Sequence, residues 1–182
     1  FLHPNPNINS QAFSILRKEF EIKFIDNLLA NLKEEDLLIR RKSILALGDF
    51  GEKTLKPIVQ IYIDTNCEIV KVSCLKTMIK VVVNFDLKEL TQDEMLVVNQ
   101  ALKEDSPEII LTVVSLLRQL GSTGRNILMK TCRDKDLLRA KASISALLEM
   151  KDQTIDDLFE DLLNDKSIDQ MIKEDILRDK II

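Results

Sequence analysis

EDLLIRRKSILALGDFG, the segment Glu35–Gly51, decides the fold. A helix is expected to start at Asp36. We expect Gly48 and Gly51 to break it, because glycine tolerates the left-handed conformation in which helices end. A second run with apolar residues at helical spacing, Leu55–Ile63, follows closely. The segment therefore predicts two helices joined by a short turn that contains glycine.

The start of this pattern recurs along the chain. In each copy an aliphatic residue is followed four positions later by a small or β-branched one, so that both lie on one helix face. A small residue at that place lets a neighbouring helix approach closely. The copies are Ile8/Ala12, Ile39/Ser43, Ile69/Ser73, Ile109/Val113 and Leu138/Ala142. Successive copies begin 31, 30, 40 and 29 residues apart, and the extra segment Asn84–Thr91 accounts for the longest interval.

Each copy is expected to open a pair of helices. In the fourth copy Ser106 is expected to cap the first helix, with Pro107 as its first helical residue. Gly121 and Gly124 are expected to end that helix, and in the fifth copy Thr154 is expected to cap the second helix. A pair of short helices cannot bury its apolar faces alone, whereas stacked pairs bury a continuous core.

Composition supports a helical chain. Only four glycines and four prolines occur among 182 residues, whereas a β-sandwich or barrel needs turn residues every 8–12 positions. The chain is also 45% hydrophobic, which excludes a disordered protein. We therefore predict an all-α fold, an α-solenoid of four to five stacked helical hairpins that form a single domain over residues 1–182. Because the chain begins with Phe1 rather than Met, we expect that an N-terminal piece is missing.

Several classes of chemistry are disfavoured. His3 is the single histidine, which excludes a two-histidine zinc site and argues against a Ser-His-Asp triad. Neither GxxxxGK nor GxGxxG occurs, and a net charge of −4 gives no sign of a surface for nucleic acid. No apolar run approaches the roughly 20 residues of a membrane span. We expect no metal, nucleic-acid or membrane partner, and the odd, sparse cysteine count indicates reduced thiols in the cytoplasm.

The quoted segment resembles the HEAT-repeat pattern, in which an acidic residue, a hydrophobe–Arg pair and a small residue precede L-G-x-x-G. Glu104–Gly124 and Asp134–Met150 are looser copies. The period of about 30 residues is shorter than the 40–47 typical of HEAT units. That period, the opening His3–Ala12 (HPNPNINSQA) and the stretch Cys67–Phe85 are similar to the phycobilisome-lyase-type HEAT proteins of cyanobacteria.

This resemblance implies a role in attaching open-chain bilins to phycobiliprotein cysteines, as a bilin lyase subunit or as a non-catalytic, chaperone-like partner, and leaves the enzyme question open. Members of the group also act in phycobilisome disassembly. The implied partners are a phycobiliprotein subunit and a second HEAT-type lyase subunit, and the implied ligand is a transient phycobilin, with no permanently bound cofactor. The alternative is a generic HEAT-repeat protein–protein interaction scaffold without catalytic activity. Thr65–Glu68 does not match the N-H-C-Q-G-N motif of a bilin-isomerising relative, so isomerisation is not expected.

The three cysteines are Cys67, Cys74 and Cys132. Cys67 and Cys74 lie seven residues apart, so we expect them on one helix face, packed as small hydrophobes. The alternative is a transient hold on a bilin or a soft metal. Cys132 precedes Arg133, a cation that lowers a thiol pKa when it lies close, but we expect no reactive thiol there.

Candidate binding residues lie on the expected second helices, which line the concave face of HEAT-type stacks. Tyr62 is the single tyrosine and has Gln60 and Asp64 close in sequence. The hypothesis is that Tyr62 and Asp64 recognise the N–H groups of pyrrole rings, and the alternative is a packed Tyr62 with a hydrated hydroxyl. Asn27 and Asn99 occupy comparable positions.

Two arginines near helix starts are further candidates. Arg40 follows Asp36 by four residues and Arg139 follows Asp136 by three, spacings at which side chains on a helix pair. The structural interpretation is a ladder of such pairs between repeats. The functional one is that Arg40 and Arg139 receive carboxylates such as bilin propionates, which suit the guanidinium fork.

Overall fold

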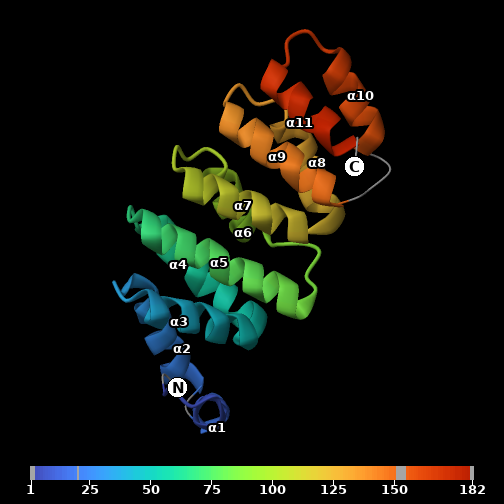
Figure 1. Ribbon diagram of the computed structural model, residues 1–182. Coiled ribbons are helices and arrows are strands. Elements are labelled where there is room, and N and C mark those ends of the chain that lie inside the picture. The colour runs from blue at the N-terminus through green and yellow to red at the C-terminus, as the bar shows by residue number, and fades with distance from the viewer. Residues whose placement is uncertain (1–2, 20, 151–154, 181–182) are drawn as a thin grey trace. The chain divides into compact units, whose positions relative to one another are not determined.

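The structure is a computed structural model that describes residues 3–19, 21–150 and 155–180 (Figure 1). Within these ranges the secondary structure is helical and no strand is present, which confirms the all-α prediction. No helix in the described ranges is both long enough and apolar enough to cross a membrane. The chain forms two compact units, Phe1–Asp86 and Leu87–Ile182. The expected single domain stays a prediction.

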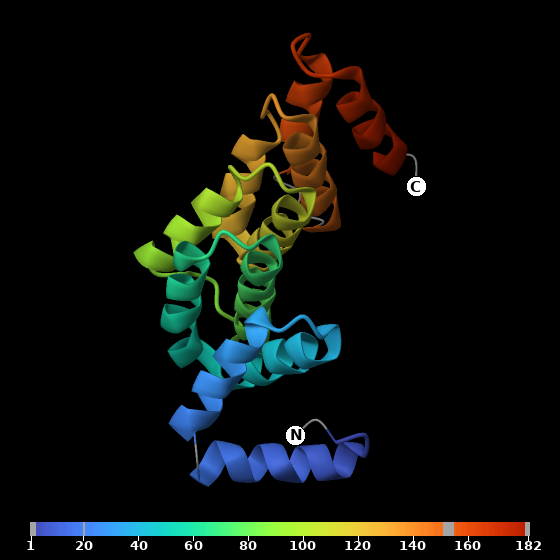
Figure 2. The same ribbon diagram turned by 90° about the vertical axis from the view of Figure 1, so that its left-hand side faces the viewer.

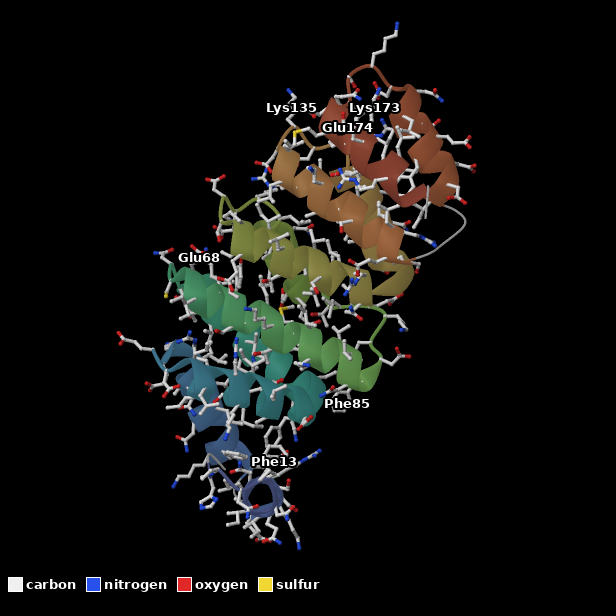
Figure 3. The ribbon with its side chains drawn as sticks, in the orientation of Figure 1. Phe13, Glu68, Phe85, Lys135, Lys173 and Glu174 are labelled. Carbon is white, nitrogen blue, oxygen red and sulfur yellow. The ribbon has the colours of Figure 1, made fainter. Side chains whose placement is uncertain are left out.

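The first unit contains five α-helices in its described part. They are α1 (Pro6–Glu19), α2 (Glu21–Ala30), α3 (Leu37–Phe50), α4 (Leu55–Asp64) and α5 (Glu68–Phe85), with short 3₁₀ turns at Asn31–Lys33 and Gly51–Thr54. α3 and α5 pack side by side, and α4 packs on α5. α1 is the outermost helix of this unit (Figure 2). Figure 3 labels the first and last residues of α5, Glu68 and Phe85.

The second unit is built in the same way. Its helices are α6 (Gln92–Ala101), α7 (Pro107–Gln119), α8 (Gly121–Thr131), α9 (Leu137–Met150), α10 (Asp156–Asn164) and α11 (Gln170–Lys180). α7 packs against α9 and α9 against α11, while α8 contacts both α7 and α9. Alternate helices are thus neighbours within each unit, as stacked hairpins require.

The helix starts follow the sequence closely. The Asp36 carboxylate accepts hydrogen bonds from the backbone N–H groups of Leu38 and Ile39 and caps α3. Ser106 caps α7, and Pro107 opens it. Both expected starts are therefore confirmed, because a cap depends on residues adjacent in sequence. The expected cap at Thr154 lies outside the described residues.

Two of the expected helix ends are wrong. Gly48 lies inside α3 and Gly124 inside α8, whereas Gly51 and Gly121 have φ angles of 75° and 56° at the breaks. At Gly48 a Cβ atom would lie 2.5 Å from Cβ of Lys80 on α5. These two interior glycines therefore serve close helix–helix approach rather than helix termination.

The expected small residues are buried where the hairpins pack. Ser43, Ser73, Val113 and Ala142 expose between 0% and 8% of their surface, and Ala12 on α1 is half-buried. Their small volume lets α3 approach α5 and α7 approach α9. The repeat seen in the sequence is thus the repeat of packed helix faces within each unit.

Candidate functional site

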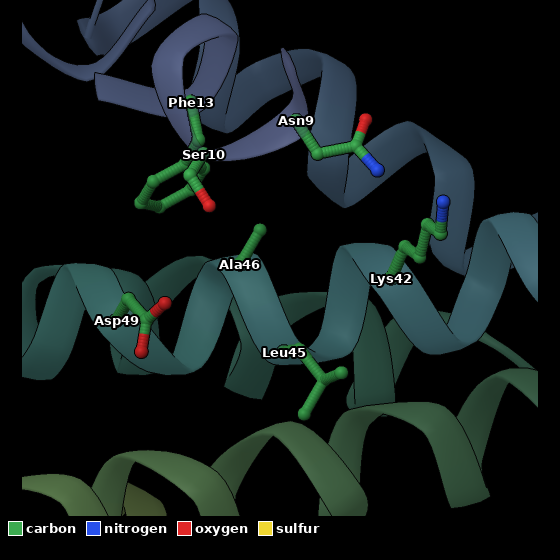
Figure 4. A pocket seen from close by; sticks show the side chains of 7 residues that line it. All are labelled: Asn9, Ser10, Phe13, Lys42, Leu45, Ala46 and Asp49. Carbon is green, nitrogen blue, oxygen red and sulfur yellow. The ribbon is translucent and has the colours of Figure 1, made fainter. Parts of the chain in front are cut away.

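A groove of about 400 Å³ lies in the first unit, between α1 and α3 (Figure 4). Asn9, Ser10 and Phe13 line it from α1, and Lys42, Leu45, Ala46 and Asp49 line it from α3. Asn9, Ser10 and Phe13 lie within about one helical turn, on the side of α1 that meets α3. The groove therefore exists only through the packing of one helix on the other.

Aromatic packing fixes the α1 side of the groove. The ring centroid of Phe13 lies 5.8 Å from those of both Phe24 and Phe50, and Phe24 and Phe50 are 5.9 Å apart. Such edge-on and tilted pairs add stability beyond simple burial. Arg17 and Lys53 lie over the Phe50 ring, at 5.6 and 5.3 Å from its centroid. Because α1 has no fully buried residue among those described, this cluster is its main anchor.

Two opposite charges stand on the α3 side. Lys42 and Asp49 are seven residues apart, which places them on one helix face about 10 Å apart along the axis. Asn84 on α5 donates a hydrogen bond of 3.0 Å to the Asp49 carboxylate and so fixes its position. Leu45 lies between the two charges and is 50% exposed. The groove thus combines a cation, a positioned carboxylate and an apolar surface.

One buried polar atom on α1 has no hydrogen-bond partner among the described residues. The amide nitrogen of Asn9 donates to the carbonyl of His3. The side-chain oxygen of Asn9 is buried and accepts no hydrogen bond from the described residues. A buried acceptor without a donor costs roughly 1–3 kcal/mol. This groove could not be predicted from the sequence, since only tertiary packing joins Asn9 to Lys42 and Asp49.

The expected site on α4 is divided between two faces of that helix. Gln60 and Asp64 are exposed, and the Gln60 amide donates a 2.8 Å hydrogen bond to the Asp64 carboxylate. Tyr62 is buried, with 2% of its surface exposed, and the Lys71 ammonium lies 5.5 Å from its ring centroid. Tyr62 therefore belongs to the core of the first unit and does not share a surface with Asp64. The binding roles of the three residues stay predictions.

Asn27 and Asn99 are both exposed. Asn27 lies on α2 in the first unit, and Asn99 lies on α6 in the second. Their binding roles also stay predictions.

Arg40 is held within its own segment. Its guanidinium donates to the backbone carbonyls of Glu34 and Glu35, just before α3. Asp36, the expected partner of Arg40, instead caps α3 through backbone N–H groups. Arg40 thus stabilises the loop that precedes α3.

Arg139 links two hairpins of the second unit. Its guanidinium donates to the Glu104 carbonyl at 3.2 Å and lies 3.7 Å from a carboxylate oxygen of each of Asp105 and Asp134. Only 17% of its side chain is exposed, and Asp136 accepts from its backbone N–H. This arrangement fits the ladder between repeats. A role of Arg40 or Arg139 in receiving a ligand carboxylate stays a prediction.

A second pocket, of about 490 Å³, lies in the second unit near the starts of α9 and α11. Its central charges are already paired, since Arg133 and Asp165 form a 3.0 Å ion pair. Hydrogen bonds from the hydroxyl and backbone N–H of Ser167 hold the pKa of Asp165 below its usual value, and Arg133 acts in the same direction. Asp165 is therefore a structural residue of the turn before α11.

The three thiols differ in exposure. Cys67 is exposed and occupies the N-cap position before α5, where its side chain makes no capping hydrogen bond, so the expectation that it packs beside Cys74 on one face is wrong. Cys74 and Cys132 are fully buried, and burial raises their pKa to about 12 and about 11. The effect of burial on Cys132 outweighs the neighbouring Arg133. In the part of the chain that the structure describes, no three His, Cys, Asp or Glu residues are grouped to hold a metal ion.

Thiol labelling of the folded protein at pH 8 is expected to modify Cys67 alone. The thiolate is the reactive species, and Cys74 and Cys132 remain protonated and buried at that pH. Mass spectrometry after iodoacetamide treatment should show one adduct per folded chain and three after denaturation. Cys67→Ser should show none when folded. Rapid modification of a second thiol in the folded wild type would contradict the burial of Cys74 and Cys132.

Comparison with known proteins gives distant relatives over most of the chain. No family model matches. The chain is 23% identical over 173 residues to an uncharacterized phycocyanin operon protein Z of Pseudanabaena tenuis. That alignment covers 94% of this chain and 86% of the relative. It is 26% identical over 156 residues to the bilin biosynthesis protein CpeZ of a Synechococcus strain. That alignment covers 82% of this chain and 84% of CpeZ. The chain is a distant homologue of both, in agreement with the resemblance found in its sequence.

Proposed function

We propose that this chain, as a distant homologue of CpeZ and of the phycocyanin operon protein, is a chaperone-like helper in the attachment of phycobilins to phycobiliprotein subunits. The observation that carries the proposal is the homology, which extends over 82% to 94% of the chain. The name of one relative states a role in bilin biosynthesis, and the name of the other places it in a phycocyanin operon.

In this role the helper binds and orients its substrates. The thioether bond forms on the phycobiliprotein's own cysteine, and holding the reacting groups in place contributes much of the acceleration of such a step. A phycobiliprotein subunit is then the partner, and a second HEAT-type lyase subunit completes the assembly. A HEAT-like solenoid is part of the same proposal, and the alternating packing of helices within each unit supports it.

A reconstitution tests this role. A phycobiliprotein subunit, a bilin supply and the partner lyase are co-expressed with and without this chain. The subunit is then denatured in acidic urea and freed of unbound pigment by gel filtration, and covalent bilin per subunit polypeptide is measured by the absorbance that remains with the polypeptide. We expect the chain to raise this ratio several-fold. The variant Lys56→Ala, at an exposed position of α4 outside the groove, should act like the wild type. An equal ratio with and without the chain would refute the helper role.

A further inference from the structure

The face of α3 that lines the groove is complementary to itself. Lys42, Leu45, Ala46 and Asp49 follow one another at positions i, i+3, i+4 and i+7, so they form one row along the helix (Figure 4). A cation stands at one end of the row, a carboxylate stands at the other, and two apolar residues lie between them. The two charged residues are about 10 Å apart along the helix axis. Reversing the direction of the helix therefore exchanges the charges and leaves the apolar centre in place.

A second copy of α3, laid antiparallel to the first, meets this row with opposite charges. The midpoint of Lys42 and Asp49 falls between Leu45 and Ala46. A two-fold axis through that point brings each lysine opposite the aspartate of the other copy and joins the apolar residues of both copies at the centre. Such an interface is isologous, because both copies use the same surface. A parallel arrangement is disfavoured, because it places like charges opposite each other.

Both charged groups on α3 are available to a second copy. The Lys42 side chain is half-buried and makes no hydrogen bond or ion pair with the described residues. The Asp49 carboxylate accepts a hydrogen bond of 3.0 Å from the Asn84 amide through one oxygen, and its other oxygen accepts none from the described residues. The Asn84 contact holds the carboxylate in place before association, so less conformational entropy is lost when the ion pair forms.

The groove has room for the apolar part of the same contact. Leu45 is half-exposed on α3, and the small side chain of Ala46 points towards α1, where it allows close approach (Figure 4). The space of about 400 Å³ between this part of α3 and Phe13 of α1 can receive Leu45 of the second copy. Leu38, also more than half exposed, lies one turn before Lys42 and extends the apolar strip. The contact thus involves α1 and α3 of both copies.

We propose that two copies of this chain associate through the α1–α3 groove about a two-fold axis, with their α3 helices antiparallel. Lys42 of each copy pairs with Asp49 of the other, and Leu45 of each copy packs in the groove of the other. The Phe13–Phe24–Phe50 cluster holds α1 in the position that forms the opposite wall. The partner is a second copy of the chain, and this inference stands independently of the proposed role in bilin attachment.

Sedimentation of the purified chain at increasing concentration tests the interface. We expect a reversible equilibrium between monomer and dimer that shifts towards monomer as the salt concentration rises, because salt screens exposed ion pairs. Lys42→Asp and Asp49→Lys should each raise the dissociation constant by about tenfold or more, since each dimer then holds two contacts between like charges in place of two between opposite charges.

A mixture of the two variants gives the signature of the antiparallel arrangement. Each variant alone dimerises poorly, because it carries the same charge at both ends of the row. When a Lys42→Asp chain meets an Asp49→Lys chain, both contacts again join opposite charges, so the mixture should form a one-to-one dimer. The double variant Lys42→Asp/Asp49→Lys should also dimerise, because its row carries both charges in reversed order. A mixture and a double variant no more dimeric than the single variants overturn the antiparallel pairing.

A matched pair of leucine variants decides the matter if a charge variant fails to fold, which thermal unfolding reveals. Leu45→Glu places a charge at the apolar centre and should abolish the dimer. Leu111→Glu places the same charge at a leucine of similar exposure in the second unit and should leave the dimer intact. A wild-type chain that stays monomeric up to about 100 μM overturns the proposal, as does a dimer that Leu45→Glu leaves unchanged. A different protein bound at this face, without self-association, also overturns it.

Discussion

Gly124→Ala is expected to destabilise the second unit by about 3 kcal/mol or more, at the upper end of the costs of overpacking. Gly124 lies on α8, where a Cβ atom would stand 1.7 Å from the backbone carbonyl oxygen of Leu117 on α7 and 2.6 Å from its carbonyl carbon. Both atoms belong to the backbone of a packed helix, so a side-chain rotation cannot relieve the clash. The two helices of the hairpin must separate instead.

The neighbouring glycine provides the control for this prediction. At Gly121 a Cβ atom would meet only the Lys88 side chain, at 3.9 Å, although the backbone has a φ of 56°. Gly121→Ala should therefore cost only about 1–2 kcal/mol, the price of a left-handed alanine. Urea unfolding followed by far-ultraviolet circular dichroism measures both values. A Gly124→Ala protein as stable as the wild type would show that α8 does not approach Leu117 so closely.

Phe50→Ala is expected to destabilise the first unit by about 3–5 kcal/mol, as for other buried phenylalanines. The Phe50 ring is 4% exposed, contacts the rings of Phe13 and Phe24, and lies beneath two cations. Its removal leaves a cavity at the place where α1 is anchored. The same urea experiment gives the free energy of unfolding.

Phe85→Ala is the matched control in the same unit. Phe85 is the last residue of α5 and is 46% exposed, so its truncation should cost about 1 kcal/mol, in line with ordinary partly exposed sites. If the two variants lose the same free energy, the aromatic cluster does not anchor α1 in the way described.

Local sequence signals predicted the helices well. The starts at Asp36 and Ser106 and the extent of α4 depend on caps and apolar spacing, which are readable from adjacent residues. The interior glycines were misassigned as helix ends because their role depends on a second helix. Gly48 faces Lys80, 32 residues away in sequence, and nothing near Gly48 reveals that contact.

The candidate site was harder to predict for the same reason. Residue type and position on second helices singled out Tyr62, but burial is set by the packing of the unit and places its ring in the core. Lys42 and Asp49 have the spacing of residues on one helix face. They line a groove only because α1 packs opposite them, with Asn9 and Phe13 forming the other wall. The resemblance to bilin lyase-type proteins, by contrast, extends over most of the chain, and the distant homology confirms it.

The most direct test of the helper role is the covalent bilin content of a phycobiliprotein subunit made with its lyase, in the presence and absence of this chain. The proposed function predicts several-fold more bilin per subunit polypeptide when the chain is present. Gly124→Ala, if it unfolds the second unit, should remove that gain. A bilin content that is the same with the chain, without it and with the variant would contradict the proposed function.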